Sequence, residues 1–181
     1  MAISKSLLDK LFGRLFKLKI LIICYSFLKF LAVGDVPVKL TNTLDCLKYI
    51  SLTINLDDSK QILAALCLFR SSPHLQEIEV TADSDKASAL IHQANFWEAN
   101  QLPLREIIFR RLRKMKLIEF KGVAHEMGFI QFVLENATVL DKLSIKRGKG
   151  FQFKELEQLP VLKKMIQFRR ASSNAKVIFL D

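Results

Sequence analysis

Apolar residues recur along the chain in a short repeat phrase, Leu-x-x-Φ-x-Φ, in which Φ is an apolar residue. The copies begin at Leu18, Leu47, Leu75, Leu112 and Leu140. Successive copies start 29, 28, 37 and 28 residues apart, which is a regular period with one long interval. The alternation at the end of each phrase is the period of a strand that buries one face. Each copy therefore predicts a short, half-buried strand.

A strand of this kind cannot bury its apolar face alone, so successive copies are expected to stack in parallel on a shared core. Three of the four intervals lie within or at the edge of the roughly 20–29 residues that are typical of leucine-rich repeats. Crossovers between parallel strands are helical and right-handed as a rule. We therefore predict an α/β fold, a short leucine-rich-repeat-like solenoid with parallel strands and helical crossovers.

The segments between the phrases show helical apolar stripes, and these segments are 57–73, 125–137 and 155–169. The first opens with three possible N-caps, Asp57, Asp58 and Ser59, and stops at Ser-Ser-Pro. Pro160 restricts where the third helix begins. Residues 175–180 are apolar and predict one last strand.

The N-terminal third contains the most apolar stretch, residues 19–33. Lys19 and Lys29 enclose only nine uncharged residues, which is short of the about 20 needed to span a bilayer. We interpret the stretch as a buried strand and its following turn, with a signal or anchor segment as the alternative. Residues 2–16 are amphipathic and predict a helix that caps the first strand. No membrane association is expected.

The 37-residue interval contains a polar segment without a clean period, residues 81–103. It predicts an inserted loop whose Phe96 and Trp97 pack on the core.

The formal net charge is +10, and residues 105–181 carry +9 of it, with 17 Lys and Arg against 8 Asp and Glu. The run 105–116 is the most basic part of this half. Such a run is consistent with a solvated surface, with an acidic protein partner or with nucleic acid. Few aromatic residues interleave with it to stack bases, so nucleic acid is not the expected partner.

Residues with metal-binding or catalytic chemistry form no recognisable site. The three cysteines, Cys24, Cys46 and Cys67, lie in apolar stretches and fit neither a metal spacing nor a disulfide framework. They predict packed free thiols in a reducing compartment, hence an intracellular protein, nuclear or cytoplasmic. The histidines are expected to be ordinary surface or capping residues: His74, His92 and His125. No metal, cofactor or catalytic residue is expected, and the protein is not expected to be an enzyme.

Three stretches and a lone tryptophan together resemble plant F-box/FBD/LRR-repeat proteins. They are LCLFRSSPHLQEIEV (66–80), Trp97, LRKMKLIEFKGVAHEMGFIQFVLENATVLDKLSI (112–145) and FRRASSNAKVIFL (168–180). The upstream stretch LKILIICYSFLKFLAVGDVPVKL (18–40) resembles the last leucine-rich repeats before the FBD region of that family. The resemblance implies leucine-rich-repeat-like units over 1–96 and an FBD-like domain over 97–181. It covers nearly the whole chain but includes no F-box, the helical module that docks on a ubiquitin-ligase adaptor. An adaptor is therefore not an expected partner of this sequence.

The resemblance implies a non-catalytic protein-binding scaffold, like the substrate-recognition part of an F-box ubiquitin-ligase subunit, with an unknown protein target. The alternatives are a basic nucleic-acid-binding module and a truncated gene product with no independent function. Strand alternation suggests which side chains would contact the target. The candidate contact residues are Lys48, Tyr49, Gln76, Glu77, Lys114 and Lys116.

Overall fold

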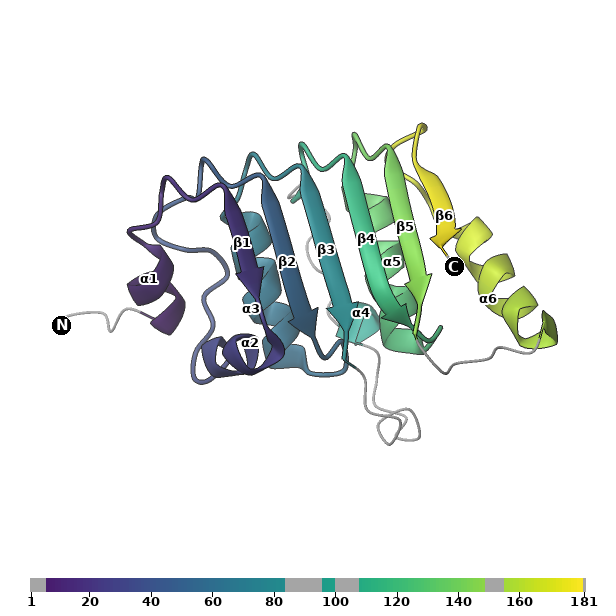
Figure 1. Cartoon of the computed structure of the whole chain (residues 1–181), viewed down its shortest axis with the longest axis horizontal. Coiled ribbons are helices and arrows are strands. Elements are labelled where there is room, and N and C mark those ends of the chain that lie inside the picture. Colours follow the sequence, from purple (N-terminus) through teal and green to yellow (C-terminus); the bar gives the residue numbers. More distant parts are fainter. Residues whose placement is uncertain (1–5, 84–95, 100–107, 149–154, 181) are drawn as a thin grey trace.

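The computed structural model of the chain describes residues 6–83, 96–99, 108–148 and 155–180. Within these residues, six strands form one sheet in chain order, and every neighbouring pair is parallel. Figure 1 shows the strands side by side. They are β1 (Ile20–Ile23), β2 (Tyr49–Ile54), β3 (Glu77–Ala82), β4 (Lys114–Phe120), β5 (Lys142–Arg147) and β6 (Lys176–Leu180). The predicted α/β class with parallel strands is confirmed, including the last strand.

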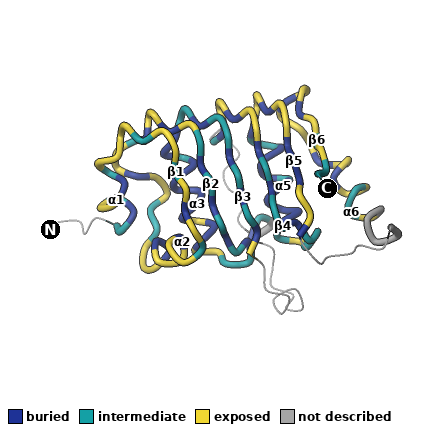
Figure 2. The backbone as a smooth tube through the Cα atoms, in the orientation of Figure 1, coloured by how far each residue is buried: buried dark blue, intermediate teal, exposed yellow. Residues whose placement is uncertain are grey.

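The repeat phrases lie in register across the sheet. Their fourth positions pair from strand to strand and are buried in β2 to β5, as Ile50, Ile78, Met115 and Leu143. Their leading leucines are at most 3% exposed in the last four phrases, at Leu47, Leu75, Leu112 and Leu140. Figure 2 shows the buried positions alternating with more exposed ones along the strands. The phrase therefore predicted both the strands and the register in which they pair.

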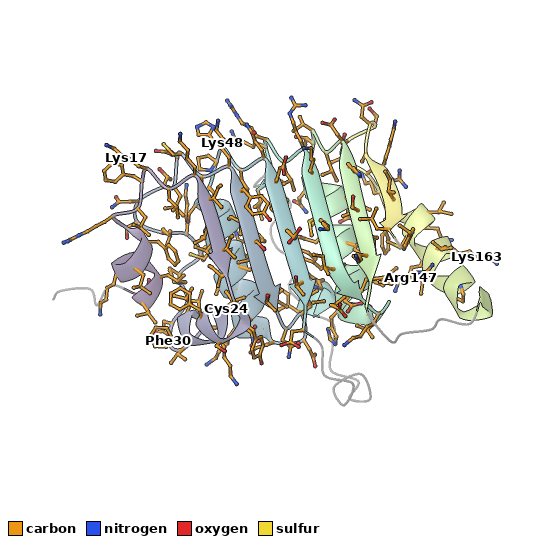
Figure 3. All side chains as sticks on the ribbon, in the orientation of Figure 1. Lys17, Cys24, Phe30, Lys48, Arg147 and Lys163 are labelled. Carbon is orange, nitrogen blue, oxygen red and sulfur yellow. The ribbon has the colours of Figure 1, made fainter. Side chains whose placement is uncertain are left out.

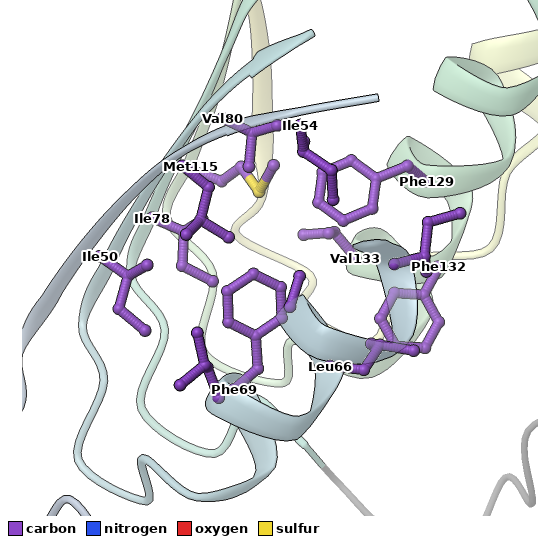
Figure 4. Close-up of a cluster of buried hydrophobic side chains, with 14 of the residues drawn as sticks. Ile50, Ile54, Leu66, Phe69, Ile78, Val80, Met115, Phe129, Phe132 and Val133 are labelled. Atoms are coloured by element: carbon purple, nitrogen blue, oxygen red, sulfur yellow. The ribbon is translucent and has the colours of Figure 1, made fainter. Parts of the chain in front are cut away.

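Helices connect the strands and cover one face of the sheet (Figure 1). They are α1 (Leu7–Phe12), α2 (Tyr25–Leu31), α3 (Ser59–Arg70), α4 (Phe96–Ala99), α5 (Ala124–Asn136) and α6 (Glu155–Gln167). Figure 4 shows the core between the sheet and helices α3 and α5, where Leu66 and Phe69 meet Ile78 and Val133. In the part of the chain that the structure describes, no helix lies over the other face of the strands.

The helices predicted from apolar stripes are present. Helix α3 begins after Asp58, whose carboxylate accepts hydrogen bonds from the backbone N–H groups of Lys60 and Gln61 at 3.0 and 3.3 Å. This is the N-cap that the sequence indicated. Helix α6 corrects one detail, because Pro160 lies inside the helix and does not limit its start.

The first strand and the residues after it differ from the prediction. Ile20 and Ile22 are 59% and 72% exposed, so β1 is not a buried strand. These two side chains point away from the helices, on the face that no helix covers. The residues that were predicted to form a turn are helix α2, which buries Leu28 and Leu31 against the core.

A short helix stands at the N-terminal end, where a cap was predicted. Helix α1 is shorter than residues 2–16, and residues 1–5 lie outside the described part of the chain. Leu8 and Phe12 are buried, whereas Leu11 and Leu15 are about 40% exposed. The cap therefore buries a narrower apolar stripe than predicted. Among the residues described, none of the helices has the length and apolarity needed to cross a bilayer.

Aromatic side chains pack together where the 37-residue interval meets helices α3 and α5. The ring centroids of Phe96 and Trp97 are 5.2 Å apart, and those of Trp97 and Phe132 of α5 are 4.8 Å apart. Phe109 lies 5.5 Å from Phe69 of α3 and 5.8 Å from Phe132. The prediction that Phe96 and Trp97 pack on the core is confirmed. Most of the predicted loop lies outside the described residues, and its first two residues belong to β3.

The three cysteines are free, and they differ in exposure. Cys67 is 0% exposed, and its burial raises the pKa of the thiol to about 12. Cys24 and Cys46 are exposed, so the prediction that all three pack in the core is wrong for these two. Cys24 is labelled in Figure 3.

This difference predicts two classes of thiol reactivity. The thiolate is the nucleophile, and its fraction at Cys67 is roughly a thousandfold lower than at a thiol of ordinary pKa. We expect Ellman's reagent to titrate two thiols rapidly in the native protein and the third only after unfolding in urea. If all three thiols of the native protein reacted at the same rate, α3 would not be packed as described.

Candidate functional site

The uncovered face of the sheet is the most extensive candidate surface. We call it the open face and define it by the outward side chains of the strands. They are Ile20, Ile22, Tyr49, Ser51, Thr53, Glu77, Glu79, Thr81, Lys114, Lys116, Ile118, Lys142, Ser144, Lys146, Lys176, Ile178 and Leu180. Parallel sheets are normally covered on both faces. A parallel sheet with one bare face is therefore suited to receive something else.

The structure brings three of the six predicted contact residues into one row. Tyr49, Glu77 and Lys114 are partners in the strand register of β2, β3 and β4. Lys116 lies two residues further along β4, on the same face. These four positions therefore lie on the open face, as the alternation indicated.

The other two predicted contact residues lie just before their strands. The backbone N–H of Gln76 donates to the carbonyl of Lys48 at 2.9 Å, and the N–H of Arg113 donates to the carbonyl of Gln76 at 2.8 Å. These bonds continue the ladder beyond the strand ends. Lys48 is exposed, and Figure 3 labels it above β2. Lys48 and Gln76 therefore belong to the rim of the open face.

Charged pairs cross between β3 and β4 on the open face. The ammonium of Lys114 lies 2.7 Å from the carboxylate of Glu77, and that of Lys116 lies 3.0 Å from Glu79. At the rim, the guanidinium of Arg113 lies 3.2 Å from Asp141 of the next repeat. Exposed pairs of this kind contribute about 0.2–1 kcal/mol each. They neutralise three cations of the basic run 105–116, namely Arg113, Lys114 and Lys116.

Sequence reasoning missed the cations that follow on β5 and β6. Lys142, Lys146 and Lys176 point to the same side as Lys114 and are exposed. The sequence did contain a pattern that could have identified Lys142. Lys114 and Lys142 both stand two residues after the leading leucine of their phrase, so aligning the phrases places them side by side.

A buried carboxylate lies at the start of α5, where the sequence analysis identified no site. Glu126 is 0% exposed, and its Oε2 accepts hydrogen bonds from the backbone N–H groups of Lys121, Gly122 and Val123 at 2.8, 2.8 and 3.3 Å. Gly122 has a φ of 77°, which favours glycine at this turn. Burial raises the pKa of Glu126, and the three N–H donors oppose that rise. The geometry is that of a carboxylate that organises a turn.

His125 lies next to Glu126 and makes a contact between repeats. Its Nε2 lies 3.0 Å from the carboxylate of Asp57, which precedes α3, and both side chains are at most 20% exposed. His125 is thus a structural contact between repeats. His92 lies outside the described residues. Across the residues described, no three His, Cys, Asp or Glu side chains gather as metal ligands would.

An apolar cavity of about 10 Å³ lies in the core under β2 and β3. Its walls are aliphatic and aromatic, and include Leu52, Phe69 and Trp97. A volume near that of a single water-sized sphere leaves no room for a ligand. It is a packing void, so the open face remains the candidate site.

The fold and the open face define an α/β protein built from repeated strand–helix units that leave one face of a parallel sheet bare. Comparison with known proteins gives matches whose names are compatible with this class. Residues 108–145 match the family model FBD. The chain is also 25% identical over 177 residues to an F-box/FBD/LRR-repeat protein of Arabidopsis thaliana, covering 97% of this chain and 39% of that relative. The resemblance to plant F-box/FBD/LRR-repeat proteins is confirmed. No solved structure matches the chain.

Proposed function

We propose that the chain is a leucine-rich-repeat-type solenoid that binds a protein through the open face and catalyses no reaction. The observation that carries this proposal is the asymmetry of the sheet. The inward positions of β2 to β5 are buried under helices, while the outward positions of all six strands have no covering element in the described residues. Repeat proteins use such extended surfaces for binding.

The comparisons support a role in recognition. The relative carries F-box, FBD and LRR in its name, and this chain spans 39% of its length. The FBD match begins at residue 108, near the proposed boundary between repeat units in 1–96 and an FBD-like domain in 97–181. Both proposed parts contribute strands to the one sheet, so a target would contact them together. In this proposal the chain supplies the target-binding surface of such a protein.

The proposal predicts that a bulky charge on the open face reduces target binding. Ser51 of β2 lies on this face between Ile22 and Glu79 in the register. We expect Ser51→Arg to reduce capture of specific partners from a plant extract by at least about tenfold, because a long side chain there obstructs a flat surface. Quantitative mass spectrometry of the captured proteins measures the loss.

A matched control separates this effect from a change of charge. Ser59→Arg makes the same substitution at an exposed position on the first turn of α3, on the helix side. Partners that bind the open face are lost with S51R and retained with S59R. If every captured protein responds equally to the two variants, the open face is not the binding surface.

A further inference from the structure

Three lysines lie directly opposite one another across the last three strands. Lys114 of β4 pairs in register with Lys142 of β5, and Lys142 pairs with Lys176 of β6. Neighbouring strands are about 4.8 Å apart. Like charges at directly opposed positions destabilise a sheet. We call this arrangement the lysine row, and nothing in the sheet itself requires it.

Among the three lysines of the row, Lys114 is the one whose charge is balanced by a described acidic side chain. Lys114 has Glu77 at 2.7 Å, and Lys116 beside it has Glu79 at 3.0 Å. In the described part of the chain, no carboxylate lies within ion-pair distance of Lys142, Lys146 or Lys176. Asp141, the acid nearest in sequence, is engaged by Arg113. Three exposed cations thus share one end of the open face, with no acidic partner among the described residues.

The chemical character of the open face changes from one end to the other. Its outward residues are apolar on β1, uncharged on β2, mainly acidic on β3 and mainly basic on β4 and β5, and β6 adds Lys176 beside two apolar residues. The acids of β3 are used by β4, so the net positive charge of the face lies on β5 and β6. A partner that matches this face must therefore bring negative charge to its C-terminal end.

We infer that β5 and β6 bind an acidic segment of a protein partner, through carboxylate or phosphate groups that contact Lys142, Lys146 and Lys176. This inference rests on the proposed function and adds the chemistry of the partner. Lys142 and Lys176 are one strand spacing apart, and Lys142 and Lys146 are about 13 Å apart along β5. Acidic groups four residues apart on an extended peptide are also about 13 Å apart, which matches Lys142 and Lys146.

The test uses a fluorescein-labelled octapeptide with Glu at alternate positions and Ser between them, and the whole chain as receptor. The variant K142Q/K176Q removes two cations of the lysine row. K29Q/K39Q is the control, because it makes the same change of charge at two exposed positions in the first repeat, far from the lysine row. We expect K142Q/K176Q to weaken peptide binding about tenfold in fluorescence anisotropy, and K29Q/K39Q to change it less than about twofold.

Two further arms identify the ligand chemistry. The same peptide with Gln in place of Glu should not bind, and one with phosphoserine in place of Glu should bind and should also depend on the lysine row. Tighter binding of a single-stranded oligonucleotide than of either acidic peptide, lost in K142Q/K176Q, would overturn the inference in favour of nucleic acid.

Thermal unfolding separates a binding role from a structural one. Removing opposed like charges should leave Tm unchanged or raise it by about 1–3 °C, with a smaller rise in high salt. A lower Tm for K142Q/K176Q would show that the lysines support the fold, and would overturn the inference. The inference would also be overturned if K142Q/K176Q and K29Q/K39Q lost peptide binding equally, because equal losses indicate non-specific charge attraction.

The two proposals fail in different ways. If Ser51→Arg removes captured partners while K142Q/K176Q changes neither capture nor peptide binding, the open face binds a protein that is not acidic, and only this inference fails. If capture responds neither to Ser51→Arg nor to K142Q/K176Q, the proposed function fails, whatever the acidic peptide does.

Discussion

Phe109→Ala should lower the free energy of unfolding by about 3–5 kcal/mol, out of the about 5–15 kcal/mol that is typical of a whole domain. Phe109 is 2% exposed, and its ring contacts Phe69 of α3 on one side and Phe132 of α5 on the other. The substitution removes both contacts and leaves a cavity between the two helices. Because stacked repeats interact mainly with their neighbours, loss at this junction separates the repeats before it from those after it.

Urea unfolding measures the effect with two probes. Trp97, the only tryptophan, lies in the same aromatic cluster at 4.8 Å from Phe132 and reports on the junction by its fluorescence. Circular dichroism reports on the whole chain. In the wild type the two transitions should coincide. In F109A the fluorescence transition should move to lower urea than the dichroism transition.

The control removes the same atoms at a position that is substantially exposed. Phe27 of α2 is 39% exposed and stacks on Phe30 at 6.2 Å. Phe27→Ala should cost about 1 kcal/mol, because little apolar area leaves the core. If F109A and F27A lose the same stability, the aromatic cluster does not couple the two halves of the sheet.

The regular part of the fold was accessible from the sequence because one constraint acts on every repeat. Each leading leucine must reach the shared core, so the spacing of the leucines determines where each strand begins and how it pairs. The same spacing located the open face, since the residues between buried positions point the other way. Tyr49, Glu77 and Lys114 were identified for this reason.

The exceptions come from the ends and the turns of the repeats, where the period carries no information. Alternation in the first phrase places Ile20 and Ile22 outward, but the highly apolar stretch 19–33 was interpreted as a buried strand, so their exposure was not predicted. The role of Glu126 depends on three backbone N–H groups that converge only because the turn at Gly122 has a positive φ. A glycine followed four residues later by Glu is a weak pattern by itself.

The second large effect concerns that carboxylate. Glu126→Ala should lower the free energy of unfolding by about 3 kcal/mol, because the backbone N–H groups of Lys121, Gly122 and Val123 lose their acceptor in a buried turn. Removal of a desolvated carboxylate offsets part of the loss. Glu135→Ala is the control on the same helix, where the carboxylate accepts from the side chain of Gln131 only. It should cost less than about 1 kcal/mol.

The pH dependence of stability distinguishes burial of Glu126 from simple loss of contacts. Burial raises the pKa of this carboxyl in the folded protein above its value in the unfolded chain. The folded state therefore holds the proton more tightly than the unfolded chain does. This proton adds to the free energy of unfolding at low pH, and the contribution is lost as the pH rises through the folded-state pKa. Glu126→Gln keeps an acceptor oxygen and cannot ionise. We compare the free energy of unfolding of the wild type with that of E126Q. The wild-type value minus the E126Q value should decrease as the pH rises above the ordinary pKa of a glutamate. A difference that increases with pH would mean that the three N–H donors outweigh desolvation and hold the carboxylate in its charged form.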